Sequence, residues 1–122
     1  MAYEFTEHPG YVQARLRGQV TMADLAAITG LLDKAEAAPG ASPHRVFDIT
    51  EAEDITVNFV AVHDFSARRR MVTLKNQVKT AIVAKTPVQF GCARMFQMVS
   101  QQPQTEVAVF SDAPSALAWV WK

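Results

Sequence analysis

The sequence predicts an α/β fold: a single domain with a five-stranded mixed sheet and four helices. Segments with period-two or continuous apolar patterning alternate along the chain with segments of helical periodicity. Such alternation is typical of a largely parallel sheet whose strands are joined by helical crossovers. The chain has 122 residues, 49% hydrophobic and 20% charged, which suits one globular domain over residues 1–122.

A β-hairpin is predicted at the start of the chain. The segment "YEFTE" alternates in polarity and runs into "HPG", a turn signal. In the following "YVQARLRG", apolar residues occupy every second position, which is typical of a strand with one exposed face. Because a hairpin is antiparallel, these two strands make the sheet mixed.

The first helix is predicted within "TMADLAAITGLLDKAEAAPG". Thr21 and Asp24 have the spacing of a capping box, with Asp in place of the usual Glu. Leu25, Ile28 and Leu32 recur at helical spacing, and the final "PG" ends the helix.

The remaining elements continue the alternation. Strands are predicted at "RVFDIT", "VKTAIVAK" and "TEVAVFSD". A second helix begins at Thr56 and ends near Arg68–Arg70, a third begins at Thr86, and a fourth is capped by Asp112. The predicted order is therefore β-β-α-β-α-β-α-β-α.

Composition excludes several classes of protein. Lys plus Arg equals Asp plus Glu at 12 each, so the basic excess expected of a nucleic-acid-binding protein is absent. The single cysteine, Cys92, cannot form an internal disulfide, and it is expected to act as a small core residue. No apolar stretch approaches the ~20 residues of a membrane span, and the polar start is not that of a signal peptide. A cytoplasmic location is expected.

The stretch "DITEAEDIT" (48–56) is predicted to form an acidic loop between a strand and the second helix. Its carboxylates either bind a divalent metal or are solvated, and the absence of EF-hand spacing favours solvation. The three histidines are scattered, with no pair at zinc-ligand spacing. We therefore predict no catalytic residues, no metal and no cofactor, and we do not expect an enzyme.

Three stretches carry a resemblance to a known family. "FDIT" (47–50), "RGQVTMADL" (17–25) and "VFSDAPSALAWV" (109–120) resemble the STAS superfamily, in particular its SpoIIAA-like branch of stand-alone bacterial domains. Members include anti-sigma-factor antagonists, in which a serine at a helix N-terminus accepts phosphate from a partner kinase and so controls binding. The resemblance implies a non-enzymatic regulatory module that binds a protein partner.

At the phosphate-accepting site of the family, this sequence departs from the family pattern. An ungapped alignment from Asp48 places the family's Asp-Ser-Ser-Gly on Thr56, Val57, Asn58 and Phe59, so an asparagine without a hydroxyl occupies the acceptor position. If the alignment is shifted by two residues, Asp54 takes the family's acidic position and Thr56 takes the acceptor position. Thr56 is then either a phosphoacceptor or a helix N-cap, and the cap is favoured because acidic neighbours would repel a phosphate. The resemblance implies a degenerate phosphoswitch with a partner loop comprising Asp48, Asp54, Thr56, Val57 and Asn58.

The alternative function is the binding of a small apolar or lipid-like ligand. The last two predicted helices are rich in methionine and aromatic residues, and ligand pockets are mostly apolar. The two tryptophans lie two residues apart on one helix, so they cannot both face inward and one is expected to be exposed. The same residues could form a homodimer contact. This predicted apolar ligand or dimer surface consists of Met95, Phe96, Met98, Trp119 and Trp121.

Overall fold

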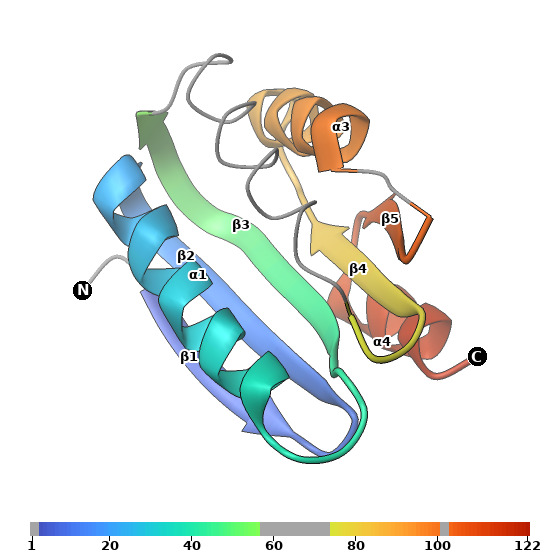
Figure 1. The fold of residues 1–122 in the computed structure, drawn as a ribbon. Coiled ribbons are helices and arrows are strands. Elements are labelled where there is room, and N and C mark those ends of the chain that lie inside the picture. Colours follow the sequence, from blue (N-terminus) through green and yellow to red (C-terminus); the bar gives the residue numbers. More distant parts are fainter. Residues whose placement is uncertain (1–2, 57–73, 101–102) are drawn as a thin grey trace.

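A computed structural model gives the structure of the chain and describes residues 3–56, 74–100 and 103–122. Strands and helices alternate after an opening hairpin (Figure 1). In chain order the described elements are β1 (Tyr3–His8), β2 (Tyr11–Thr21), α1 (Met22–Ala37), β3 (His44–Thr56), β4 (Val78–Val83), α3 (Pro87–Ser100), β5 (Thr105–Phe110) and α4 (Ala113–Val120).

The strands form one five-stranded sheet in the order β1-β2-β3-β4-β5. β1 pairs with β2 in antiparallel orientation, and each later pair is parallel. The predicted mixed sheet with an N-terminal hairpin is therefore confirmed. Because β3, β4 and β5 are parallel, the sheet has an amino edge, where they begin, and a carboxyl edge, where they end.

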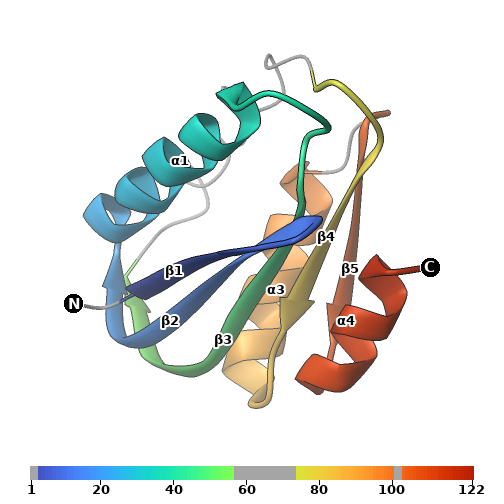
Figure 2. The same ribbon diagram turned by 90° about the horizontal axis from the view of Figure 1, so that it is seen from below.

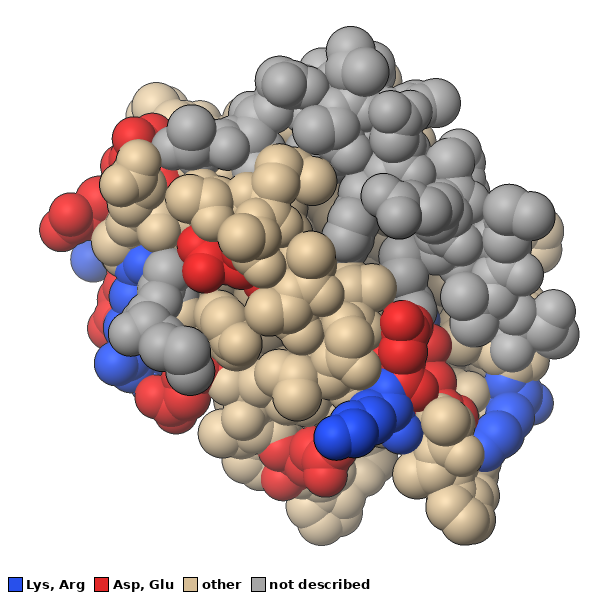
Figure 3. Space-filling view, turned by 60° about the vertical axis from the view of Figure 1, so that its left-hand side comes forward, with Lys and Arg blue, Asp and Glu red and all other residues tan. Residues whose placement is uncertain are grey.

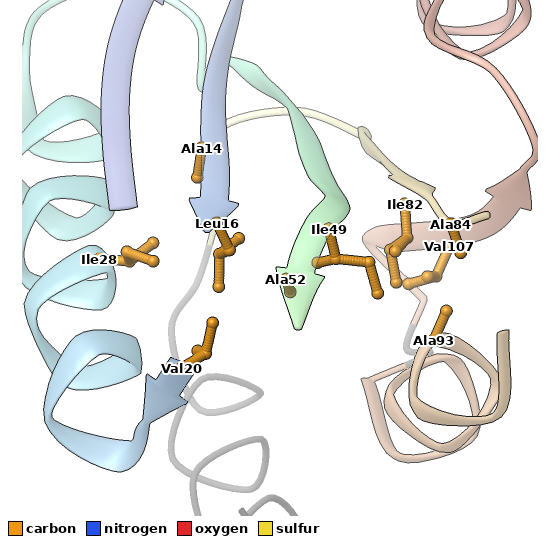
Figure 4. Close-up of a cluster of buried hydrophobic side chains, with 10 residues drawn as sticks. All are labelled: Ala14, Leu16, Val20, Ile28, Ile49, Ala52, Ile82, Ala84, Ala93 and Val107. Atoms are coloured by element: carbon orange, nitrogen blue, oxygen red, sulfur yellow. The ribbon is translucent and has the colours of Figure 1, made fainter. Parts of the chain in front are cut away.

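The helices cover both faces of the sheet (Figure 2). One face carries α1 and α3, whose Ile28 and Ala93 belong to the same buried cluster (Figure 4). The opposite face carries α4, whose Ala116 and Val120 pack on β3 and β4. The α1–α3 cluster consists of Ala14, Leu16, Val20, Ile28, Ile49, Ala52, Ile82, Ala84, Ala93 and Val107.

Three helices lie in the described part of the chain, where the sequence predicts four in the whole chain. The predicted second helix, after Thr56, falls on residues 57–73 and lies outside the described residues. The cap of α1 is confirmed: Thr21 Oγ1 accepts from the Asp24 amide, and the Asp24 carboxylate accepts from the Thr21 amide at 2.8 Å. Asp112 likewise caps α4 by accepting from the Ser115 amide. None of the described helices is long and apolar enough to cross a membrane.

The prediction that the acidic stretch forms a loop is wrong, because β3 continues through Glu51–Asp54 to Thr56. Its pairing with β2 shifts register twice, between Arg15 and Arg17 and between Gly18 and Gln19. Each shift adds one residue to β3 and changes which face the following side chains occupy. Ile49, Ala52 and Ile55 consequently contact one cluster at a spacing of three, and the period of two that identifies a strand is lost.

Candidate functional site

Asp48 has a structural role within β3. Its side chain is buried, and Oδ1 accepts from the Thr50 amide at 2.9 Å and from the Thr50 hydroxyl at 2.6 Å. Its other oxygen lies 3.9 Å from Nε of Arg15 on the neighbouring strand. These bonds stabilise the first register shift, so Asp48 does not belong to an exposed loop.

The other residues of the predicted partner loop lie at or beyond the end of β3. Asp54 is exposed and stands opposite Gln19. The backbone of Thr56 ends the strand opposite Thr21, the cap of α1. Val57 and Asn58 lie outside the described residues, as does any helix that Thr56 would cap. The structure therefore places Asp54 and Thr56 at the carboxyl edge and leaves the acceptor position untested.

Gln89 joins the start of α3 to the irregular part of β3. Its buried side chain donates from Nε2 to the Thr50 carbonyl at 3.1 Å and the Ala52 carbonyl at 2.9 Å. Its Oε1 accepts from the amides of Lys85 and Thr86, two N–H groups at the helix start. One side chain thus satisfies backbone groups of both elements and fixes α3 against the carboxyl edge.

α3 exposes an apolar stripe. Val88 is 80% exposed and Met98 is 78% exposed, and these are two of the most exposed large apolar side chains in the described chain. Between them Cys92 and Met95 are half-buried. These four residues, the α3 stripe, follow helical spacing along about 15 Å of one side of the helix.

The five residues of the predicted apolar surface do not lie together. On α3, Phe96 faces the core, where its ring packs edge-on against that of Phe47 with the ring centroids 6.3 Å apart. Met95 is half-buried and Met98 is exposed. Trp119 packs on Phe110 in the cluster of the opposite sheet face. Trp121 is 59% exposed, so one tryptophan is exposed as the spacing predicts.

A groove of about 630 Å³ opens at the amino edge of the sheet. It lies between the C-terminal end of α1, the hairpin turn, the loop before β3 and the last residues of the chain. We call it the amino-edge groove. Among its lining residues are Glu7, Val12, Lys34, His44, Val120 and Trp121.

Two groups near these surfaces have shifted pKa values. Burial, followed by the charges of Lys79 and Arg45, lowers the pKa of His44 below 6.5. Burial raises the pKa of the Cys92 thiol, which disfavours the reactive thiolate. The sequence predicts Cys92 to be a core residue, whereas in the structure it is half-buried.

Within the described ranges, no group of three His, Cys, Asp or Glu side chains could hold a metal ion.

Charges of both signs are mixed on the face shown in Figure 3, and neither sign forms a continuous area there. Opposite charges also pair across the sheet: Arg17 on β2 lies 2.8 Å from the Glu51 carboxylate on β3 and 3.3 Å from the Glu4 carboxylate on β1. A basic stripe of the kind that follows a nucleic-acid backbone is absent from the described residues of this face.

Comparison with known proteins gives matches by structure. No family model matches the sequence, and no curated protein matches it. An uncharacterised protein from Shewanella loihica PV-4, of the DUF3478 family and with a SpoIIAA-like fold, matches with a TM-score of 0.64 and 22% identity over 98% of this chain and 92% of that one. The fold is SpoIIAA-like. An anti-sigma factor antagonist from Mycobacterium paratuberculosis matches with a TM-score of 0.64 and 15% identity over 98% of this chain and 93% of that one.

The SpoIIAA-like fold agrees with the resemblance seen in the sequence, but two features of this chain were missed there. Gln89 follows a Thr-Pro helix start at the position where a capping box places Glu or Gln, so the spacing of Thr86 and Gln89 was an available signal. The amino-edge groove combines segments far apart in the chain, and no local pattern indicates it.

Proposed function

We propose that this chain is a non-enzymatic regulatory module that binds a protein partner through the α3 stripe. The observation that carries the proposal is the exposure of Val88 and Met98 on a helix that is otherwise anchored to the sheet. Large apolar side chains that stay exposed along one side of a helix are typical of protein contact sites. The fold shared with an anti-sigma factor antagonist supports the same class of function.

The partner's surface is expected to have an apolar centre and a basic rim. The exposed carboxylates of Glu53 and Asp54 lie at the end of β3, at the same carboxyl edge of the sheet as the start of α3. Acidic groups beside an apolar contact steer a basic partner and fix its orientation. Gln89 holds α3 in place, which lowers the conformational cost of binding.

This binding operates without the family's phosphoswitch. The ungapped alignment puts Asn58 at the acceptor position, and the amide side chain of asparagine cannot accept a phosphoryl group as serine does. A new dianion near Thr56 would also meet the acidic neighbours Glu53 and Asp54. Binding is therefore constitutive, or is controlled at the partner.

The test is quantitative affinity capture from the native host with the whole chain as bait. Val88→Glu and Met98→Lys each place a charge on an exposed apolar position at one end of the stripe, and each charge suits the dipole at its own helix end, so the fold is retained. Ala118→Glu, at an exposed position of α4 on the opposite face, is the matched control. A partner captured by wild type and Ala118→Glu but depleted about ten-fold or more by both stripe variants supports the proposal. Equal capture by all four baits contradicts it.

A small apolar ligand, the alternative function, would need a single apolar pocket. The five residues that predicted it lie on opposite faces of the sheet, and only Trp121 lines the amino-edge groove. The protein-binding function is therefore the better supported of the two.

A further inference from the structure

We propose that the amino-edge groove binds a small planar aromatic anion, such as an aromatic carboxylate. This site lies at the opposite edge of the sheet from the start of α3, so it is independent of the proposed protein contact. Three features carry the inference: an apolar floor with an aromatic wall, a half-buried hydrogen-bond donor, and an excess of lysines at the rim.

The apolar floor is formed by Val12 and Val120, which are almost completely buried. Trp121 forms the wall. Its ring packs edge-on against that of Tyr11, with the ring centroids 5.8 Å apart. It also lies over Gly10, where an added Cβ atom would be 3.0 Å from the indole ring. The glycine thus allows the indole to approach the turn closely while 59% of Trp121 stays exposed. A planar aromatic ring can stack on that exposed surface.

The donor is His44. Its Nδ1 accepts from the Lys79 amide at 2.9 Å, so in the neutral ring the proton resides on Nε2. Nε2 has no hydrogen-bond partner among residues 3–56, 74–100 and 103–122, and His44 is one of the residues that line the groove. A donor held in this way favours a ligand that brings an acceptor oxygen.

The rim is basic. Lys34 and Lys122 line the groove and Glu7 opposes them, with His8 also at the rim. Lys75 Nζ donates to the Ala38 carbonyl at 2.5 Å, which offsets the negative end of the α1 dipole that would otherwise repel an anion. Lys79 Nζ donates hydrogen bonds to the carbonyls of Trp119 and Lys122. Among the side chains that line the groove, two lysines, Lys34 and Lys122, stand against one carboxylate, that of Glu7, so the lining favours an anion.

The wall opposite Trp121 is rigid. The Ser42 amide donates to Asn76 Oδ1 at 2.6 Å, and Asn76 Nδ2 donates back to the Ser42 carbonyl at 3.1 Å. The Lys75 amide donates to the Ser42 hydroxyl. These bonds join the loop before β3 to the loop before β4, so the groove exists before a ligand enters and binding need not order it.

The test is a titration of the ¹⁵N-labelled whole chain with 2-naphthoate, followed by two-dimensional NMR. The expected result is saturable shifts of the Trp121 indole N–H and of the Gly10 and His44 amides, with a Kd on the order of 1 mM for a ligand of this size. The neutral isostere 2-naphthamide should bind about five-fold or more weakly, because it lacks the charge.

Three variants separate the site from non-specific binding. Trp121→Ala removes the stacking surface and should abolish saturation, and Lys34→Glu should weaken naphthoate binding about five-fold or more without weakening the amide. Lys85→Glu, at an exposed position two residues before α3, is the charge control and should bind as wild type does. The proposal is overturned by no saturation up to about 10 mM, by equal affinity for the amide, by shifts confined to α3, or by undiminished binding to Trp121→Ala.

Discussion

Gln89 and Ala52 join a helix to a strand 37 residues away: the amide Nε2 of Gln89 donates to the Ala52 carbonyl at 2.9 Å. The same nitrogen donates to Thr50, whose carbonyl lies next to the first register shift of β3. A strand with such shifts loses regular pairing, and an unsatisfied buried carbonyl is costly. Gln89 therefore allows β3 to remain extended through its acidic stretch and also positions α3, the proposed binding helix.

Replacement of Gln89 by leucine should lower the free energy of unfolding by about 2–4 kcal/mol, because two strand carbonyls and two helix-start amides lose their partner. Gln89→Glu should cost at least as much: its oxygens still accept from the amides of Lys85 and Thr86, but the buried carboxylate cannot donate to the two strand carbonyls and repels them. Urea denaturation measures both, with exposed Glu106→Gln as the control, expected to be within about 0.5 kcal/mol of wild type. A leucine variant as stable as wild type would show that the bonds contribute little.

The contact of Gly10 with Trp121 gives a double-mutant prediction. Gly10→Ala should destabilise the fold by about 1–2 kcal/mol, because φ is +83° and the new Cβ meets the indole at 3.0 Å. In a Trp121→Ala background the cost should fall but not vanish, since the steric part is relieved and the backbone strain remains. Strictly additive effects, measured by thermal and urea unfolding of the four chains, would rule out the contact.

Arg45 and Glu36 form a buried ion pair between β3 and the C-terminal end of α1. Nη2 of Arg45 lies 2.7 Å from the Glu36 carboxylate, and the two side chains are only 10% and 7% exposed. Glu36→Gln should cost about 3 kcal/mol, because it leaves a buried guanidinium without its compensating charge. Glu4→Gln, in the exposed pair with Arg17, should cost less than about 1 kcal/mol and is the control. Equal costs for the two variants in denaturant titrations would contradict this.

His44 makes stability depend on pH. Its pKa in the folded protein is lowered below 6.5, chiefly by burial, so the unfolded chain takes up a proton first as the pH falls. The free energy of unfolding should therefore decrease as the pH drops below 6.5 and stop decreasing below the folded pKa. Above 6.5 the residue is neutral in both states and contributes no pH dependence. His44→Asn, which retains an acceptor for the Lys79 amide, should have a flatter stability curve over this window than wild type. An identical curve would show that other groups cause the dependence.

The sequence predicted those parts of the fold whose signals are local. The hairpin at Pro9-Gly10, the Thr21–Asp24 capping box and the Asp112 cap each depend on residues within four positions of one another. The length of β3 could not be predicted in the same way, because its register shifts break the period of two and its many carboxylates are poor strand formers.

The candidate sites were harder to predict for a related reason. The amino-edge groove combines the hairpin turn, the end of α1 and the last residues of the chain, which only the tertiary fold brings together. Met95, Met98 and Trp121 were identified as apolar surface candidates from composition, but their helical spacing does not reveal that α3 and α4 lie on opposite faces of the sheet. That assignment depends on crossover connections over the whole chain.

Site-specific photo-cross-linking in the native host tests the central claim most directly. A benzophenone amino acid replaces Met98 on the α3 stripe or, as the control, Ala118 on the exposed side of α4. The account predicts a discrete cross-linked product of this chain with one other protein from position 98 and none from position 118. Three results would contradict a partner-binding role for α3. They are the same products from both positions, no product from either position, and, from position 98, only a product of twice the chain's own mass.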